Sequence, residues 1–351
     1  MRALVVIPGR QLHGAERALM DLATSWRNRG GVSIVATPDD GAASRAAHAA
    51  GIETHDLRQR RGALRHALRL RSLVDRQTVD VVIVDSDEGA WSAAVAVRMA
   101  RRGVVVRRVA AGEALPAGWR SRWSAKLARI GFVFTLPATG ADAAPAGPLG
   151  VRLAEARDDA DEAFDTPPRL ICVAGSREAE GRALGEVLRA FALLRRRFPR
   201  LRLAIVGVQD RTMQTRARLH AAALRVAEGM DWISDPLHGV EALRRAEIGC
   251  VVAGGDDCVY GLLDLMAWGI PVVASRTTLS EHYVADGIHG ALLAVMDAAH
   301  IASELSAMLA SPDGRTAMGH AARMRVQREF SDADMAAPFE LMASRLLRRS
   351  A

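Results

Sequence analysis

The stretch GCVVAGGDDCVYGLLDLMAWGIPVVAS, residues 249–275, has the pattern of a strand, a helix and a second strand. The unbroken apolar run at its start is typical of a strand that is buried on both faces. Apolar residues at helical spacing follow from Leu262 to Trp268, and Gly269-Ile-Pro271 turns the chain into the next apolar run. Because parallel strands are joined by crossover helices, this pattern predicts a parallel sheet covered by helices.

The same alternation continues through the chain on the N-terminal side of this unit, which predicts repeated β-α-β units with right-handed crossovers. The expected strands are 4–7, 32–36, 81–84, 104–109, 169–173, 201–206, 249–253 and 271–274, and the expected helices are 15–26, 61–76, 89–101, 184–197, 213–228 and 262–268. The fold class is therefore α/β.

An acidic stretch with two prolines, residues 156–168, interrupts every periodic pattern and is expected to be a linker. It separates a Rossmann-like domain at 1–155 from a second Rossmann-like domain at 169–330, and residues 331–351 are expected to form a terminal helix. Ligands of open parallel sheets bind beyond the carboxyl ends of the strands, so we expect two domains that face each other across a cleft.

Composition limits the classes of function. Half of the 351 residues are hydrophobic and 25% are charged, which is typical of a fully folded globular protein with two cores. The opening apolar run is too short for a signal peptide, no apolar stretch is long enough to span a membrane, and the 3 cysteines have no metal-ligand spacing. A cytoplasmic protein is expected. The net charge of +7 comes from arginines spread over helices with few aromatic residues, which argues against nucleic-acid binding.

Residues 118–134, GWRSRWSAKLARIGFVF, place Trp119, Trp123, Leu127 and Ile130 at helical spacing, with basic residues beside them. This pattern suits peripheral contact with an anionic membrane, at its inner face for a cytoplasmic protein. The alternative is that the apolar stripe packs into the core of the first domain.

The loop GRQLHGAER, residues 9–17, joins the first strand to the first helix. Glycine lets the backbone approach a ligand closely, and a helix start presents free amides, so Gly14 is expected beside a phosphate or an acceptor oxygen. His13 is the candidate catalytic residue, with a structural role in the turn as the alternative. The loop lacks the GxGxxG pattern, so a dinucleotide is not expected.

Two carboxylates follow the strand 249–253. Asp256 and Asp264 lie eight residues apart, and we expect them across the loop and the first helical turn. One is suited to a sugar hydroxyl and the other to a ribose, with the amides near Gly261 and Leu262 facing a phosphate. Carboxylates at a helix start also serve as caps, which is the alternative role.

A second acidic group, Asp85-Ser-Asp87-Glu88, ends the run at 81–84. Carboxylates of this kind can hold a divalent cation that bridges a diphosphate. The alternative is a solvated turn at a strand end. We expect no metal site here.

Several motifs in this order resemble the retaining family-four glycosyltransferases of GT-B architecture. They are His13-Gly14-Ala15-Glu16-Arg17, Leu149-Gly150-Val151, Phe191-Ala-Leu-Leu-Arg195, Leu203-Ala-Ile-Val-Gly207, the block 256–275 and the segment 284–293. The resemblance implies two Rossmann-like domains and transfer of a sugar, with retention, from a nucleotide-sugar donor to a glycan or glycolipid acceptor. It also implies that the second domain holds the donor and that no cofactor is required.

The resemblance implies roles for particular residues as well. The paired glutamates of the family correspond to Asp256 and Asp264. The arginine and lysine that usually clamp the diphosphate correspond, without gaps, to Gly175 and Glu180, so the basic clamp is not evident. We expect Arg177 or Arg182 to replace it, because a guanidinium suits phosphate oxygens well.

The missing clamp keeps other functions open. A leaving diphosphate needs fixed positive charge in the transition state, so a catalytically degenerate binding or scaffold protein of the same fold is the main alternative. A nucleotide-dependent hydrolase or epimerase is a third.

Overall fold

The computed structural model describes residues 1–10, 12, 14–57, 63–110, 113, 119–135, 147, 149–151, 169–175, 178–208, 210–233 and 241–348. The chain forms two compact units, which are Met1–Gly150 together with Ser331–Ala351, and Val151–Phe330. The expected linker at 156–168 lies outside the described residues.

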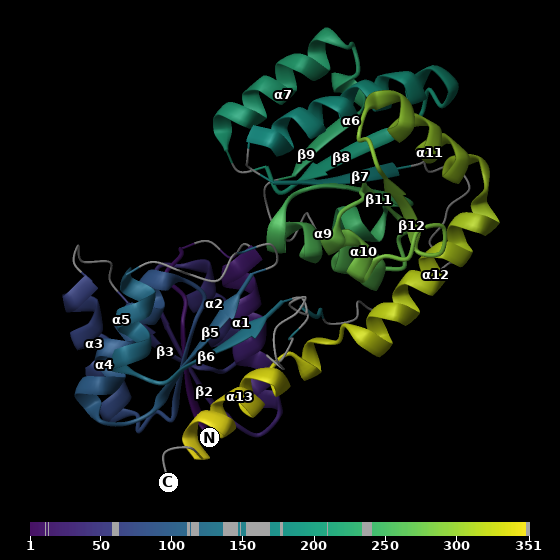
Figure 1. Cartoon of the computed structure of the whole chain (residues 1–351). Coiled ribbons are helices and arrows are strands. Elements are labelled where there is room, and N and C mark those ends of the chain that lie inside the picture. The colour runs from purple at the N-terminus through teal and green to yellow at the C-terminus, as the bar shows by residue number, and fades with distance from the viewer. Residues whose placement is uncertain are drawn as a thin grey trace. The chain divides into compact units, whose positions relative to one another are not determined.

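The first unit is built on a six-stranded sheet with the order β3-β2-β1-β4-β5-β6 (Figure 1). All neighbouring strands are parallel, as the alternating pattern predicts. The strands are β1 (Arg2–Val6), β2 (Val32–Thr37), β3 (Glu53–Asp56), β4 (Val81–Val84), β5 (Val104–Val109) and β6 (Ile130–Phe134). The helices are α1 (Gly14–Asn28), α2 (Ala42–Ala49), α3 (Ala63–Arg76), α4 (Asp87–Ala100), α5 (Trp119–Leu127) and the C-terminal α13 (Ala337–Arg348), which follows the short η3 (Asp332–Asp334).

Helices cover both faces of this sheet. Ala3, Val5 and Ile7 point to one face, where they join the core formed with α1, α2 and α13. Leu4 and Val6 point to the opposite face, where α3 and α4 pack. The first apolar run is therefore buried on both sides, which confirms the expectation from its sequence.

The stripe at 118–134 is not one helix. The helix α5 ends at Leu127, and Ile130 belongs to the strand β6, so the expected helical stripe is wrong beyond Leu127. The aromatic and β-branched run IGFVF favours an extended chain. Gly131 in this strand leaves room for the Met342 and Leu346 side chains of α13.

The second unit repeats the design with the order β12-β11-β10-β7-β8-β9, again all parallel. Its strands are β7 (Arg169–Ala174), β8 (Arg202–Val206), β9 (Met230–Ile233), β10 (Ile248–Val252), β11 (Val272–Ser275) and β12 (Gly290–Leu293). Its helices are α6 (Glu178–Arg197), α7 (Arg211–Ala223), the short η2 (Ala227–Gly229), α9 (Gly255–Ala267), α10 (Thr278–Tyr283), α11 (Ala298–Ala310) and α12 (Pro312–Glu329).

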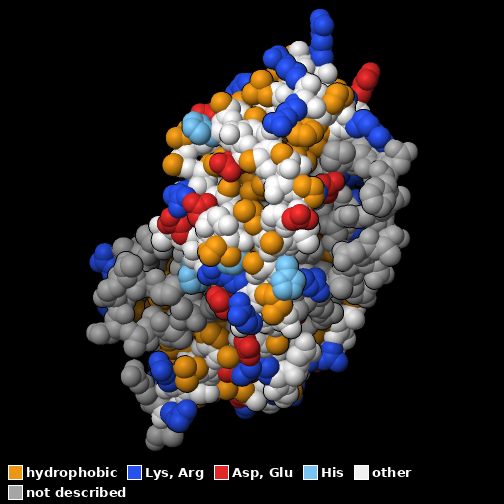
Figure 2. All heavy atoms as spheres, turned by 90° about the vertical axis from the view of Figure 1, so that its right-hand side faces the viewer, with side chains coloured by type: hydrophobic (Ala, Val, Ile, Leu, Met, Phe, Trp, Pro, Cys, Tyr) orange, Lys and Arg blue, Asp and Glu red, His pale blue; other side chains and the backbone are white. Residues whose placement is uncertain are grey.

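The helices of the second unit also form two layers. The core that contains Cys172 of β7 and Cys250 of β10 is shared with α6, α7 and α11. The helix α9 packs on the other face, with α10 and α12 beside it. With helices on both faces of each sheet, both units have the doubly wound Rossmann strand order. Acidic, basic and hydrophobic side chains are intermixed on the face shown in Figure 2.

Candidate functional site

The strands β7 and β10 are neighbours in the middle of the second sheet. From β7 the chain adds β8 and β9 on one side, and from β10 it adds β11 and β12 on the other. The pairing of β7 with β10 brings Ala174 opposite Val252, so the two strands end at the same level. The chain then continues into α6 from β7 and into α9 from β10, on opposite faces of the sheet. The starts of two helices therefore meet at one edge, where doubly wound sheets bind their ligands and where helix amides favour anions.

The helix α9 begins earlier than the sequence suggests. Gly254 is its N-cap and Gly255 has φ +58°, a left-handed conformation that favours glycine. Asp256 follows in the first turn and is only 7% exposed. Asp256 therefore lies at the edge where β7 and β10 end, as the sequence predicts.

Asp264 lies deeper along the same helix and is partly buried. Eight residues of α-helix correspond to about 12 Å along the helix axis. The expectation that both carboxylates lie across the loop and the first turn is therefore wrong for Asp264. The loop was expected to be longer because Gly254 and Gly255 precede two acidic residues, although acidic residues also suit the first turn of a helix.

Gly261 and Leu262 lie inside α9 and are buried. Their amides belong to the helix interior, so the expectation that they face a phosphate is wrong, and the amides that lack an intrahelical acceptor are those of the helix start, residues 254–257. A Cβ atom at position 261 would lie 3.0 Å from Val173 Cγ1 and 3.3 Å from Val251 Cγ1. The lack of a side chain at Gly261 instead allows α9 to pack closely on β7 and β10.

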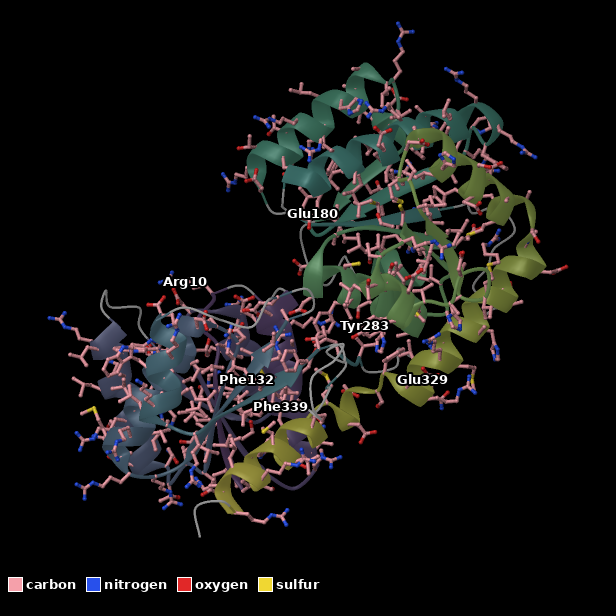
Figure 3. All side chains as sticks on the ribbon, in the orientation of Figure 1. Arg10, Phe132, Glu180, Tyr283, Glu329 and Phe339 are labelled. Atoms are coloured by element: carbon pink, nitrogen blue, oxygen red, sulfur yellow. The ribbon has the colours of Figure 1, made fainter. Side chains whose placement is uncertain are left out.

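Glu180 also lies at this edge, a position that the sequence alone did not predict. It lies in the first turn of α6, it is 7% exposed, and its Oε1 accepts a hydrogen bond from the Gly254 amide at 2.7 Å (Figure 3). Its Oε2 lies against Gly175, where any side chain would collide with it. A carboxylate of the chain thus occupies the start of α9. The resemblance to the family implies only that the usual lysine is absent at position 180.

Glu180, Asp256 and Asp257 place acidic side chains at this edge. Burial raises the pKa of the Cys258 thiol to about 12, and the charges of Glu180 and Asp257 add to this rise. Arg182 is exposed on the next turn of α6. Its companion candidate, Arg177, lies outside the described residues.

Arg182 also lines an open cavity of about 580 Å³ between α6 and α7. Gly181 and Gly185 form the α6 wall, and Met213 and His220 approach them from α7. The remaining charged lining is Asp210 and Arg216, so the cavity carries groups of both signs.

In the first unit, Gly14 is the buried first residue of α1, and His13 lies outside the described residues. Earlier in the chain, the Arg10 carbonyl accepts a hydrogen bond from the Ala42 amide at 2.8 Å, and the Arg10 side chain forms an exposed ion pair with Asp40 at 3.0 Å (Figure 3). Arg10 is thus fixed to the start of α2.

The acidic group 85–88 has structural partners. The Ser86 hydroxyl caps α4 by accepting a hydrogen bond from the Gly89 amide at 3.2 Å. Asp87 forms an ion pair at 2.6 Å with the buried guanidinium of Arg107, which also pairs with Glu113. Within the described ranges, no cluster of three or more His, Cys, Asp or Glu residues is arranged to hold a metal ion.

Solved structures share this architecture over the whole chain. A glycosyltransferase from Rickettsia africae ESF-5 is 16% identical, with 99% of this chain and 98% of that chain covered and a TM-score of 0.79. HepE (Alr3699) from Anabaena, in complex with UDP and glucose, is 14% identical, with coverage of 98% and 99% and a TM-score of 0.77. Sucrose-phosphate synthase from Thermosynechococcus elongatus is 15% identical, with full coverage of both chains and a TM-score of 0.71. These likenesses establish the fold.

Residues 155–325 match the family model of glycosyl transferases group 1. The chain has the GT-B fold, and its second unit carries a glycosyltransferase domain. The matched segment includes β7, α6, β10 and α9, so it contains the edge described above. No curated protein matches the chain in sequence. None of its described helices is long and apolar enough to cross a membrane.

Proposed function

We propose that this glycosyltransferase transfers a sugar from a nucleotide-sugar donor to a glycan or a lipid-linked acceptor, with retention of configuration. One observation carries the proposal: the starts of α6 and α9 meet at the edge where β7 and β10 end. Such an edge suits the phosphates of a nucleotide. The donor class is further supported by HepE, whose structure contains UDP and glucose.

The carboxylates of α9 would hold the donor. Asp256 is buried at the helix start, where its carboxylate would accept hydrogen bonds from hydroxyl groups of the sugar. Asp264, two turns deeper and partly buried, is proposed for the ribose. Gly261 and Leu262 would act indirectly, by fixing the position of α9 on the sheet.

The leaving diphosphate needs positive charge. The exposed guanidinium of Arg182 is the described group of α6 that is suited to this role, and Arg177 is proposed beside it. Fixed dipoles and cations of this kind stabilise the charge that develops on the leaving group, so the reaction would need no metal cofactor. On the acceptor side, we propose Gly14 for close approach of the acceptor and His13 as the candidate catalytic residue.

We further propose that the enzyme works in the cytoplasm and contacts an anionic membrane through α5. Trp123 is 56% exposed on this helix, and Arg122 and Lys126 are exposed beside it. The helix α3, which like α5 packs against α4, supports the idea because it exposes Leu64 and Leu68 together with several arginines. Exposed apolar side chains among cations suit an anionic lipid surface.

The main alternative is a binding or scaffold protein that keeps the fold without catalysis. The carboxylate of Glu180 at the start of α9 favours this alternative, because it places negative charge where a diphosphate would bind. Catalysis and mere binding differ in whether sugar is transferred.

The test is a thermal-shift screen with nucleoside diphosphates and their sugars, followed by an assay for release of the nucleoside diphosphate. Ligand binding must raise the melting temperature by mass action. Asp256→Asn is expected to weaken donor binding about tenfold to a hundredfold, since a hydrogen bond to a charged group contributes about 1.5–3 kcal/mol. The matched control is Asp257→Asn, because Asp257 is exposed in the same turn. Binding without turnover would support the scaffold alternative, and the absence of any shift would refute a nucleotide donor.

A further inference from the structure

The start of α9 already holds an anion that belongs to the chain. The Glu180 carboxylate reaches from α6 to the Gly254 amide at 2.7 Å, although the two residues are 74 positions apart in the sequence. Glu180 is almost fully buried, and the absence of a side chain at Gly175 makes room for its second oxygen. The contact is therefore built by two glycines and one acidic residue from two different helix starts.

This contact uses a group that a phosphate would need. A helix start offers a small number of free amides, and an anion bound there is held by those amides and by the helix dipole. The Gly254 amide is one of them, and it is bonded to Glu180. A diphosphate that approaches the same amides also meets the negative charge of the carboxylate at short range.

We propose that Glu180 is a resident anion of the donor site, which competes with the donor diphosphate for the start of α9 and so weakens the binding of nucleoside diphosphates. The proposal rests on the proposed function, because it assumes that a nucleotide sugar is the donor. Glu180 then sets the affinity for the donor by repelling the diphosphate and not by attracting it.

The first experiment measures binding of UDP, ADP, GDP and inorganic pyrophosphate to the wild type and to Glu180→Gln by isothermal titration calorimetry. Glutamine keeps an oxygen for the Gly254 amide but removes the charge, so the fold is expected to persist. Affinity for pyrophosphate and for the nucleotide that binds is expected to rise about tenfold or more, because charges a few ångströms apart near a protein surface interact strongly.

A second variant guards against misfolding of the first. Glu180→Asp keeps the charge but withdraws it by one methylene from the Gly254 amide, and an affinity between those of the wild type and Glu180→Gln is expected. The matched control is Glu186→Gln on the same helix. Glu186 makes the same kind of contact elsewhere, because its Oε2 accepts a hydrogen bond from the Ala298 amide at the start of α11 at 3.1 Å. Its substitution is expected to leave anion affinity unchanged.

The outcomes separate this proposal from the proposed function. Stronger pyrophosphate binding by Glu180→Gln, with no nucleotide bound by any variant, would support the resident anion and refute the nucleotide donor. A nucleotide that binds the wild type as well as it binds Glu180→Gln, or better, would refute the resident anion and leave the donor class standing. Failure of both variants to bind either pyrophosphate or a nucleotide would overturn both proposals.

Discussion

Replacing Gly319 by alanine is expected to destabilise the second unit, although alanine normally favours a helix. Gly319 is a buried residue of α12 that packs against the backbone just after α9. A Cβ atom at this position would lie 2.9 Å from the carbonyl carbon of Gly269 and still closer to its oxygen. Because the obstacle is backbone, no side-chain rotation can relieve the contact.

The size of the effect follows from two opposing contributions. Alanine is better than glycine inside a helix by about 1 kcal/mol. Overpacking costs about 1–3 kcal/mol, and the upper end applies here because α12 itself must move away from α9. That movement also strains the hydrogen bond of Arg323 to the Ala267 carbonyl, one turn further along α12. We expect a net loss of about 2 kcal/mol, which lowers the melting temperature of a unit of this size by about 4–8 °C.

Differential scanning calorimetry and urea titration of the variant measure this loss. The matched control is Gly314→Ala on the same helix, where a Cβ atom would approach only the rotatable side chain of Ser311. This variant is expected to be as stable as the wild type or slightly more stable. If Gly319→Ala raises the melting temperature as Gly314→Ala does, the close packing of α12 on α9 is wrong.

Three further predictions follow from other parts of the molecule. Burial and the charge of Arg325 lower the pKa of His289, whose Nδ1 accepts a hydrogen bond from the Ala285 amide at 2.9 Å. The neutral imidazole of His289 therefore stabilises the fold fully above pH about 6.5, and this stabilisation is lost as the pH falls below that value. Urea midpoints of the wild type and His289→Gln from pH 7.5 to 5 test this, and parallel profiles would contradict it. Arg107→Met is expected to lower the free energy of unfolding by about 2–3 kcal/mol in urea titration, because the buried guanidinium pairs with Asp87 and Glu113. The loss is not larger because both carboxylates are partly exposed and can be hydrated in the variant. A loss of less than about 0.5 kcal/mol would mean that these ion pairs add little to stability. Trp123→Ala is expected to reduce retention on anionic vesicles in flotation assays without changing the melting temperature, and a wild type that is not retained would refute the membrane contact.

The interior strands could be predicted from the sequence and the edge strands could not. The apolar runs at 4–7, 81–84 and 249–253 correspond to β1, β4 and β10, which have neighbours on both sides and helices on both faces. The strands that the pattern missed are β3, β6, β9 and β12, and each lies at the edge of its sheet. An edge strand is partly exposed, and a sequence such as ETHD in β3 carries no apolar run.

The candidate site was predictable in part for a similar reason. Asp256 follows a strand directly, so its place at the carboxyl edge could be inferred from the local pattern. The contact of Glu180 with Gly254 joins two helix starts that only the pairing of β7 with β10 brings together. No local spacing encodes such a contact, because it depends on the strand order of the sheet.

The path of the chain gives the first unit an unusual order of synthesis. The helix α13 contributes Phe339 and Ala343 to the core of the first unit, and Ala336 just before it joins the same core, yet the ribosome makes these residues only after all of 151–330. During translation the nascent sheet of the first unit therefore lacks the cover that α13 gives to β5 and β6, while the second unit has its complete sequence and can fold first. A ribosome that stalls before residue 331 would leave this apolar surface accessible to chaperones and to other nascent chains.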